Sequence, residues 1–180
     1  MYPVLRLLST VIRAHFAAKV PATGTGEMSF ICRPWDLDMF MEMNNGRILT
    51  LFDLGRFDLT IRAGVVPVMR AKKWGLAVAG STVRYRKRIT AFKRVTMRTR
   101  LAGYDDKWIL IEQSMWLGDQ PAASILLRTC FTAKGRAVST QEALEAIGLS
   151  DWTPQLSDWA DGWAKNDNIR PWPPMMDETL

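Results

Sequence analysis

Asp38 is the side chain of this sequence that is best placed to do chemistry. It stands in the stretch WDLDMFMEMNNGRIL, residues 35–49, about one helical turn ahead of a predicted buried helix. The first amides of a helix lack intrahelical acceptors and carry partial positive charge. A carbonyl oxygen laid against them would be polarised, and the oxyanion formed on attack would be stabilised. Asp38 could then attack that carbonyl directly or take a proton from water.

The residues around Asp38 suit this chemistry, but they also allow a plainer interpretation. Met39, Phe40, Met41 and Met43 would supply an apolar wall that excludes water and strengthens electrostatic interactions. Asp and Asn are equally ordinary residues of turns and helix caps. The spacing alone therefore leaves both a catalytic aspartate and a turn-forming aspartate open.

Other catalytic classes lack the residues that they require. The one histidine, His15, lies in a predicted N-terminal helix, so Ser–His–Asp and Cys–His mechanisms have no base. Cys32, Cys130 and a single histidine are too few for a zinc site. The segment PATGTGE matches no nucleotide-binding loop, because Ser29 stands where a third glycine is needed. We expect no metal and no cofactor, and a carboxylate would have to carry any hydrolysis.

A long buried helix is predicted to begin just after Asp38. Asn44 or Asn45 suits the N-cap, because its side-chain oxygen can accept from a first-turn amide. The following residues are apolar nearly all round, which is typical of a helix buried on most sides, and Gly64 then ends the run. Gly46 and Gly55 disfavour a helix interior, which suggests that another element packs closely against the backbone there.

The rest of the body is predicted to be an antiparallel sheet. Residues 28–37 suit a short extended segment, and residues 139–148 suit a closing helix. Runs rich in β-branched and aromatic residues predict strands at residues 76–89, 93–104, 107–117 and 122–134. The connections between these four runs are short enough for hairpins. We therefore expect an α+β domain in which a curved antiparallel sheet wraps around the central helix.

Both ends of the chain differ from the body at residues 28–148. Residues 1–20 predict an amphipathic helix that packs on its own domain or on a partner subunit, with membrane-surface attachment as the alternative. Its arginines interrupt any span long enough to cross a bilayer. Residues 149–180 hold four of the eight tryptophans and more acids than bases. We expect this extension to dock its tryptophans on the body or on a neighbouring subunit.

The positive charge of the chain is concentrated in one segment. Between Arg84 and Arg100 there are eight basic residues and no acid, whereas the whole chain carries a net charge of +6. Such a local concentration indicates an anionic partner. Aromatic side chains do not alternate with the arginines on one face, as a platform for single-stranded nucleic acid would favour. Nucleic acid is therefore not expected, and binding of nucleic acid or of an anionic membrane ranks third among the functions.

The stretch CRPWDLDMFMEMNNGRILTLFDLGRFDL, residues 32–59, resembles the signature of hotdog-fold thioesterases of the 4-hydroxybenzoyl-CoA thioesterase type. That signature combines Asp-x-Asp, a Gly-His linker, an Asn-Asn pair before a Tyr, and an acid with an Arg further on. The turn GYDDKW, residues 103–108, is similar to one in the thioesterase superfamily member 6-like group. The resemblance covers residues 28–148 and leaves both ends outside it.

This resemblance implies a hotdog fold, a homodimer or a dimer of dimers, and hydrolysis of acyl-CoA thioesters at the subunit interface. The catalytic aspartate of the family falls on Asp38, and its helix-start amides fall on Asn44 and Asn45. The acid and arginine of the signature fall on Asp53 and Arg56, which we interpret as a structural pair because they stand three residues apart on a helix.

The sequence departs from the family at three positions after Asp38. Met41 and Glu42 replace the usual Gly-His, and Ile48 replaces the tyrosine. Met41, with Phe40, is expected to line the substrate slot and to crowd it, because glycine allows closer approach. Glu42 is a second catalytic candidate that could raise the pKa of Asp38, act as the base, or face solvent. A catalytically weak or inactive protein that binds acyl-CoA or another lipid-like ligand is the alternative function.

Arg86, Lys87 and Arg88 are the candidates for binding the phosphates of coenzyme A. Guanidinium and ammonium groups at a strand rim suit such charges. The alternatives are that these residues form a solvated sheet face or hold the acidic C-terminal extension. We expect a cytoplasmic protein, with peripheral membrane contact through residues 1–18 as the further alternative.

Overall fold

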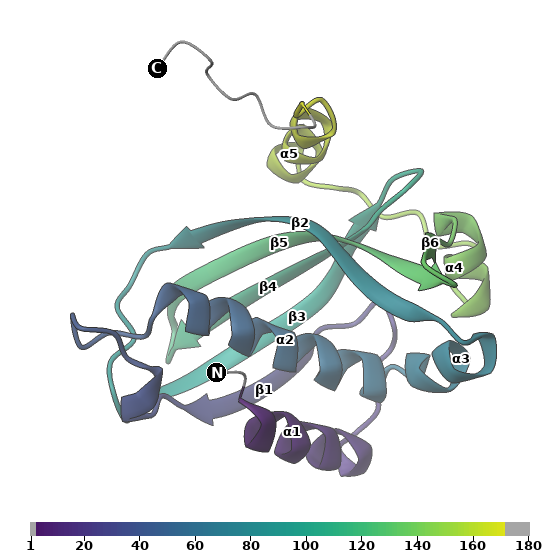
Figure 1. Cartoon of the computed structure of the whole chain (residues 1–180). Helices are drawn as coiled ribbons and strands as arrows, with labels where there is room; N and C mark the ends of the chain where they lie inside the picture. The colour runs from purple at the N-terminus through teal and green to yellow at the C-terminus, as the bar shows by residue number, and fades with distance from the viewer. Residues whose placement is uncertain (1–2, 172–180) are drawn as a thin grey trace.

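The computed structural model describes residues 3–171 and shows a curled antiparallel sheet wrapped around one long helix (Figure 1). The elements in chain order are α1 (Val4–Phe16), β1 (Gly26–Ile31), a short 3-10 helix η1 (Pro34–Asp36), α2 (Asn45–Arg62), α3 (Val65–Lys72), β2 (Gly75–Tyr85), β3 (Arg94–Tyr104), β4 (Ile109–Leu117), β5 (Gln120–Ala133), β6 (Arg136–Ala137), α4 (Thr140–Ala146) and α5 (Asp158–Asn168). The predicted α+β architecture with a central helix is confirmed.

The sheet order differs from the predicted meander at one step. The strands are arranged β1-β3-β4-β5-β2, with β6 paired to β5, so β3, β4 and β5 form the predicted meander. The predicted hairpin between residues 76–89 and 93–104 is wrong, because β2 pairs with β5 instead of β3. The connection after β2 therefore leads from one edge of the sheet to β3, which lies beside β1 near the opposite edge. Hydrophobic alternation predicts strands one at a time, and it carries no information on which strands are neighbours.

Helix α2 is buried against the concave face of the sheet, as its all-round apolar pattern predicts. Leu51, Phe52 and Leu54 are almost completely buried and belong to the main core with side chains of β3, β4 and β5. A methyl group on Gly55 would collide with Met97, Thr99 and Gln113, which confirms the predicted close packing there. At Gly46 that prediction is wrong, because only the side chain of Asn44 lies near.

The chain after α2 differs from the predicted pattern in two places. Residues 65–72, for which the sequence predicted no element, form helix α3. Pro67 lies in the first turn of α3, where the missing N–H has no intrahelical partner to lose. Strand β2 ends at Tyr85, four residues before the predicted end at Ile89. The amides of Arg86 and Lys87 both donate to the carbonyl of Ala122, which ends the regular pairing.

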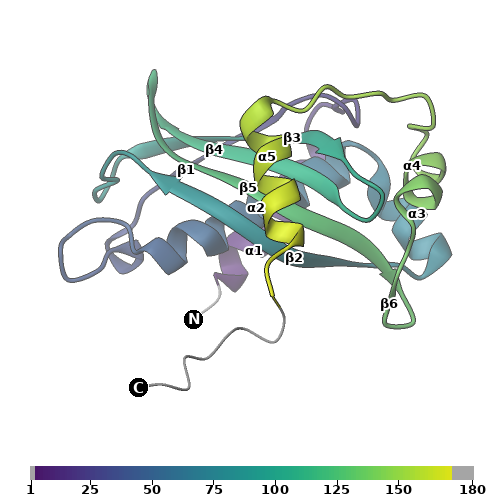
Figure 2. The same ribbon diagram turned by 90° about the horizontal axis from the view of Figure 1, so that it is seen from above.

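Helix α5 crosses the face of the sheet opposite to α2 (Figure 2). Ala160 and Ala164 pack there on Leu110 and Leu126. Arg128 of β5 forms an ion pair with Asp167, and its guanidinium lies over the rings of Trp108 and Trp163. The extension therefore docks on the body, although the sequence did not predict a helix in it.

The tryptophans of the extension differ in how they dock. Trp163 packs with Ala160 and Ala164 of α5, and Trp152 packs against Tyr104 with tilted rings and 5.7 Å between ring centroids. Trp159 is exposed, and Trp172 lies outside the described residues. Trp152 and Trp163 thus dock on the body, whereas Trp159 does not, and its docking on a neighbouring subunit stays a prediction.

Helix α1 packs beneath α2 and β1 at the lower side of the molecule in Figure 1. Thr10 and Ala14 are its buried residues. Within residues 3–171, no helix is both long enough and apolar enough to span a bilayer.

Candidate functional site

The loop that carries Asp38 is a tight turn between η1 and α2. The Asp38 amide donates to the carbonyl of Glu42 at 2.9 Å, and the Met41 amide donates to the carbonyl of Asp38 at 3.1 Å. The Asp38 carboxylate accepts a hydrogen bond from the Phe40 amide at 2.8 Å. Asp38 is half-buried and lies in the loop directly before α2. Asp38 therefore both stabilises the turn and carries the candidate reactive carboxylate.

Met41 adopts a left-handed backbone conformation, with a φ of 59°. Side chains with a β-carbon disfavour this region by about 1–2 kcal/mol, whereas glycine adopts it without that cost. The left-handed turn gives a physical reason for glycine at this position in the family signature. The Met41 side chain itself is 67% exposed, so it fills no internal space within this chain.

Glu42 lies beside Arg88, which brings two of the predicted site residues together. Their side chains form an ion pair with an N–O distance of 2.9 Å. The loops that carry them are joined by a hydrogen bond from the Met43 amide to the carbonyl of Ile89 at 2.7 Å. Arg88 therefore stands at the rim of the Asp38 turn, although the end of β2 has separated it from any strand.

The start of α2 has the geometry that the Asn pair predicts. Asn44 is the N-cap and accepts from the Arg47 amide at 3.2 Å. Its own amide donates to the carbonyl of Asp36 at 2.9 Å, which fixes the loop on the helix. Within the described part of the chain, the amides of Asn45 and Gly46 have no acceptor, as expected for a first turn. Both residues are exposed, so a ligand can reach these amides.

Asp36, the first acid of the Asp-x-Asp motif, has a structural role that the sequence did not reveal. It is 1% exposed and binds Arg6 of α1 through both carboxylate oxygens, at 3.1 and 2.7 Å. Arg47 of α2 lies 3.3 Å away, and the Arg33 amide also donates to the carboxylate. One buried carboxylate thus ties α1, η1 and α2 together. The partner Arg6 is distant in sequence, so local spacing carried no signal for it.

Asp53 and Arg56 form the predicted ion pair on α2. Burial raises the pKa of Asp53, and the charge and hydrogen bond of Arg56 act in the opposite direction. Arg56 also donates to Gln113 at 2.6 Å, and Gln113 in turn donates to Thr99 and to the carbonyl of Phe52. This buried polar network joins α2 to the centre of the sheet. Gln113 alternates with Ile111 and Met115 on the inward side of β4, and a polar residue at such a position could have predicted a buried hydrogen-bond network.

The predicted apolar wall around Asp38 is open within a single chain. Met43 is buried in the core, but Met39, Phe40 and Met41 are exposed by 86%, 68% and 67%. Between α2 and the sheet there is an apolar cavity of about 50 Å³. That volume suits one or two water molecules and not an acyl chain. A dry slot at Asp38 therefore requires a second molecular surface.

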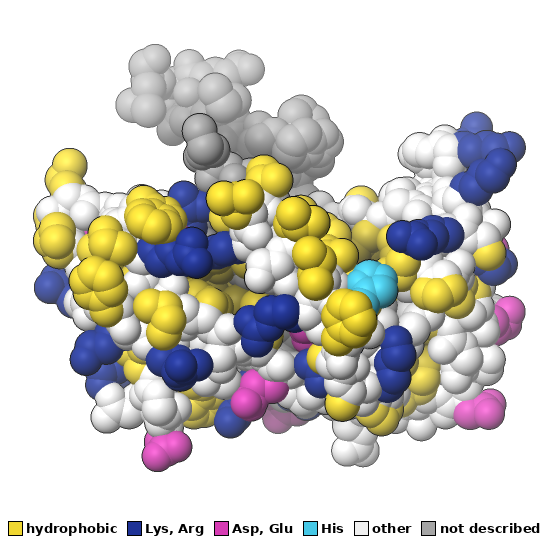
Figure 3. Space-filling model, turned by 90° about the horizontal axis from the view of Figure 1, so that it is seen from below, with side chains coloured by type: hydrophobic (Ala, Val, Ile, Leu, Met, Phe, Trp, Pro, Cys, Tyr) yellow, Lys and Arg dark blue, Asp and Glu magenta, His cyan; other side chains and the backbone are white. Residues whose placement is uncertain are grey.

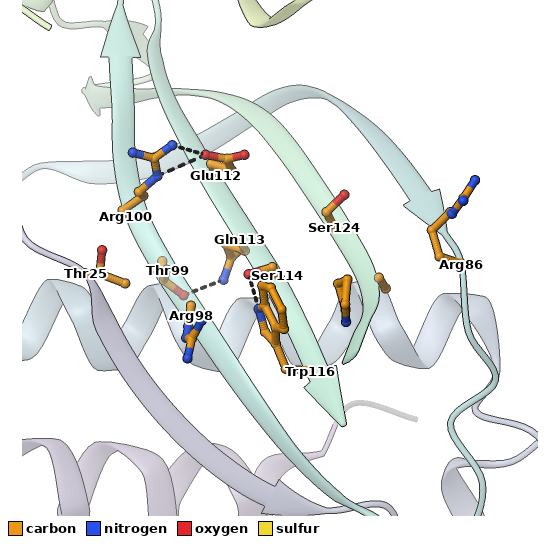
Figure 4. A pocket seen from close by; sticks show the side chains of 12 residues that line it. Thr25, Arg86, Arg98, Thr99, Arg100, Glu112, Gln113, Ser114, Trp116 and Ser124 are labelled. Carbon is orange, nitrogen blue, oxygen red and sulfur yellow. Dashed lines mark hydrogen bonds and ion pairs between the residues drawn. The ribbon is translucent and has the colours of Figure 1, made fainter. Parts of the chain in front are cut away.

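The outer face of the sheet holds a groove of about 450 Å³ with several basic side chains (Figure 4). Arg98 pairs with Glu27 at 3.0 Å, and Arg100 pairs with Glu112 at 2.5 Å. In Figure 4, Arg86 stands apart from these pairs and points away from them. Arg98 and Arg100 thus form a solvated sheet face with paired charges, whereas Arg86, Lys87 and Arg88 are exposed residues after the end of β2, and their role stays a prediction. Within residues 3–171, Asp167 of the extension pairs with Arg128 and Arg170.

The cysteines are placed as packing residues. Burial is the main cause that raises the pKa of the Cys32 thiol, to about 11, with a further contribution from Asp36. Burial also raises the pKa of Cys130, and Lys107 acts against it. Neither thiol is therefore an activated nucleophile at neutral pH. In the described part of the chain, no three His, Cys, Asp or Glu side chains come together as metal ligands.

Comparison with protein families gives a match over most of the chain. A model described as "Thioesterase-like superfamily" matches residues 32–180. Relatives named "Protein THEM6" include one from Xenopus laevis, 38% identical over 85 residues, which are 47% of this chain and 41% of the relative. One from Drosophila melanogaster is 33% identical over 111 residues, which are 61% of this chain and 58% of the relative. The chain thus spans about two-fifths to three-fifths of the length of these relatives.

Solved structures with the same arrangement of elements are also found. "YbaW Probable Thioesterase" from Escherichia coli has a TM-score of 0.61 at 20% identity, over 67% of this chain and 97% of that chain. A "Thioesterase complexed with coenzyme A and Zn" from Thermus thermophilus has a TM-score of 0.59 at 22% identity, over 71% of this chain and 95% of that chain. At these identities the likeness is one of fold. The comparisons confirm the predicted resemblance and the predicted hotdog fold.

Proposed function

Because the chain belongs to the thioesterase-like superfamily, we propose that it hydrolyses acyl-CoA thioesters to the free acid and coenzyme A. The observation that carries this proposal is the position of Asp38 in a fixed turn directly before the open amides of α2. A carboxylate next to unpaired helix-start amides combines a base or nucleophile with an electrophilic site.

In the proposed reaction, the thioester carbonyl oxygen accepts hydrogen bonds from the amides of Asn45 and Gly46. Gly46 takes the place expected for Asn44, because the Asn44 amide already donates to the carbonyl of Asp36. The Asp38 carboxylate removes a proton from a water molecule as that water attacks the carbonyl carbon. The tetrahedral intermediate then collapses, the carbon–sulfur bond breaks, and the coenzyme A thiolate leaves and takes up a proton. Direct attack by Asp38 through a mixed anhydride, which water then hydrolyses, gives the same products.

The neighbouring residues receive supporting roles in this proposal. The ion pair between Glu42 and Arg88 supports a role for Glu42 in holding the turn, in place of the role of base. Arg86, Lys87 and Arg88 follow β2 as an exposed basic segment that can meet the phosphates of coenzyme A. Phe40 and Met41 would contact the acyl group once their exposed surfaces are covered.

The cover for this slot is proposed to be a second copy of the chain in a homodimer. Leu49 and Phe57 lie along one side of α2 and are 38% and 43% exposed. Strand β2 is the edge of the sheet at that end, so its outer backbone groups are available for pairing. Together with Phe40 and Met41, these surfaces would give an apolar interface next to Asp38.

The activity is tested by incubating the purified full chain with a panel of short, medium, long-chain and aromatic acyl-CoAs and a thiol reagent. We expect release of coenzyme A from at least one class, well above the rate without protein. Absence of thiol release across the whole panel would reject the hydrolase assignment. The panel also identifies the acyl group, because the rate will depend on how well the chain fits the slot.

The second candidate function is binding of acyl-CoA or another lipid-like ligand without hydrolysis. The exposed Met41 side chain favours it, because it stands where the family signature has glycine and takes up space at the turn. Isothermal titration with the same acyl-CoAs separates the two. Saturable binding without thiol release would support the binding protein, and binding with turnover would support the enzyme.

A further inference from the structure

Helix α1 presents an apolar stripe to the outside of the molecule. Leu5, Leu8, Ile12 and Phe16 recur at spacings of three and four residues and so share one side of the helix. Their side chains are exposed by 80%, 56%, 51% and 89%. An amphipathic helix on a globular domain normally turns such a stripe inward. Here the stripe is left without a partner in the described part of the chain.

The contacts of α1 fix this orientation. Thr10 and Ala14, on the opposite side of the helix, are buried against the body. Arg6 is bound to the buried carboxylate of Asp36 and donates to the carbonyl of Ile31 at 2.9 Å. Rotation of α1 to bury the stripe would break this pair and leave Asp36 without its α1 partner. The outward stripe is therefore a stable feature of the fold.

A basic groove runs beside the stripe, between α1 and β1. It has a volume of about 360 Å³, and Arg13, Arg33 and Arg94 line it together with Met28 and Phe30. None of its lining residues is an acid. The sequence from residue 1 to residue 26 likewise contains Arg6, Arg13 and Lys19 but no acid. The groove thus combines positive charge with an apolar floor.

The side of the molecule that carries α1 mixes hydrophobic and basic side chains (Figure 3), with the one histidine, His15 of α1, in cyan. Trp35 is 66% exposed near the groove, with the Arg33 guanidinium 5.3 Å from its ring centre. Tryptophan and arginine are typical residues of the membrane–water interface. Apolar side chains rimmed by basic ones are the pattern of helices that lie in the surface of anionic bilayers.

We propose that α1 and the groove between α1 and β1 form a docking site for a membrane surface containing anionic phospholipid. Leu5, Leu8, Ile12 and Phe16 enter the boundary of the acyl chains, and Arg13, Arg33 and Arg94 bind the lipid phosphates. A second copy of the chain suits this surface less well. A twofold contact would bring the same basic residues of both copies together without compensating acids.

Docking is tested by flotation of the full chain with vesicles of phosphatidylcholine alone and of phosphatidylcholine with an equal amount of phosphatidylserine. The protein should float with the anionic vesicles and remain largely free with the neutral ones. Binding should weaken as salt is raised, because each arginine contributes through charge. Equal binding to both vesicles would overturn the role of the groove, and no binding to either would overturn the site.

Two variants separate the stripe from the groove. The variant Arg13→Gln/Arg33→Gln/Arg94→Gln should bind anionic vesicles about a hundredfold more weakly, since each surface arginine is worth about fivefold. Its control, Lys107→Gln/Lys134→Gln/Arg136→Gln, has the same net charge but is changed in the β3–β4 turn and the β5–β6 hairpin, and it should bind as the wild type does. Equal loss in both variants would show that only net charge matters and would overturn the groove.

The stripe variant Leu5→Gln/Ile12→Gln/Phe16→Gln changes only exposed side chains and should keep the thermal unfolding midpoint. It should lose flotation, whereas Ile169→Gln, which removes an exposed isoleucine 79% accessible at the end of α5, should not. Unchanged flotation of the stripe variant would overturn the proposal. A second result would also overturn it: the wild type is a dimer that does not bind vesicles, and the stripe variant is a monomer. The stripe would then be an interface between two copies of the chain. Neither readout depends on hydrolysis.

Discussion

Met41 holds a backbone conformation that glycine adopts more easily than methionine. Its φ of 59° closes the turn from Asp38 to Glu42, and its side chain gains no burial in return. A residue held in an unfavourable conformation near a reactive group is often found at functional sites. In this chain the same residue also occupies space above the proposed slot.

Replacing Met41 by glycine should raise the free energy of unfolding by about 1 kcal/mol, because the left-handed conformation then costs less. Under the proposed function, thioester turnover should rise as well, since the slot becomes more open. Urea denaturation measures the first effect, and the acyl-CoA assay measures the second. Met39→Gly is the matched control: it is 86% exposed, lacks a positive φ, and should lose stability slightly. Equal destabilisation by both variants would contradict the account of the turn.

At the residue scale, the sequence predicted the side chains whose role depends on residues close to them in the sequence. Asn44 as a cap and Asp53 with Arg56 as a pair follow from spacings within one helical turn. Asp36 could not be separated from Asp38 in this way, because the two acids stand two residues apart in the same short stretch. The difference between them is made by Arg6, whose approach depends on how α1 folds back.

At the element scale, Asp36 joins three segments of the chain through one buried carboxylate. Helix α1, the η1 loop and α2 all contact it, and its side chain is 1% exposed. A buried charge with several partners is expensive to disturb, because removing it leaves the partner charges uncompensated.

The variant Asp36→Asn should therefore lower the free energy of unfolding by about 3 kcal/mol. Helix α1 should also become easier to cleave by trypsin, because Arg6 loses its ion pair. Glu27→Gln breaks an exposed pair with Arg98 and serves as the control, with an expected loss of less than about 1 kcal/mol. Similar losses in the two variants would argue against Asp36 as a structural centre.

The elements that the sequence predicted well are those with strong local signals. Helix α2 has a cap, a long apolar run and Gly64, and strands β3, β4 and β5 follow one another as hairpins. The position of β2 was not predictable in this way, since its partner β5 lies beyond two intervening strands. Helix α5 was missed because the residues that it buries, Ala160, Ala164 and Asp167, are small or charged and give no strong apolar stripe. Its stability depends on the contacts of these residues with the sheet.

At the scale of the whole molecule, several apolar surfaces remain uncovered in one chain. Leu49 and Phe57 of α2 are partly exposed, β2 is an edge strand of the sheet, and the Asp38 turn with Phe40 precedes the start of α2. The sequence predicted that α1 is amphipathic, but it did not reveal that the stripe faces outward. That direction depends on Thr10, Ala14 and the Arg6–Asp36 pair, which only the folded chain brings together.

Light scattering should give a mass twice the 20.4 kDa of the chain, because a homodimer would cover the α2 side and the edge of β2. The variant Leu49→Asp/Phe57→Asp should give the monomer mass, since two charges would be buried without partners. Ile169→Asp at the end of α5 should remain dimeric. A monomeric wild type at assay concentration, still active, would contradict a slot shared by two subunits.

The most direct measurement is the kcat/KM of Asp38→Asn for the best acyl-CoA of the panel, alongside its thermal unfolding midpoint. Asparagine can still accept the hydrogen bond from the Phe40 amide, so the turn and the midpoint should be preserved. It can neither take a proton from water nor attack the carbonyl. The account predicts that kcat/KM falls by about 10²–10⁴-fold in a folded protein. An unchanged kcat/KM would contradict Asp38 as the catalytic group.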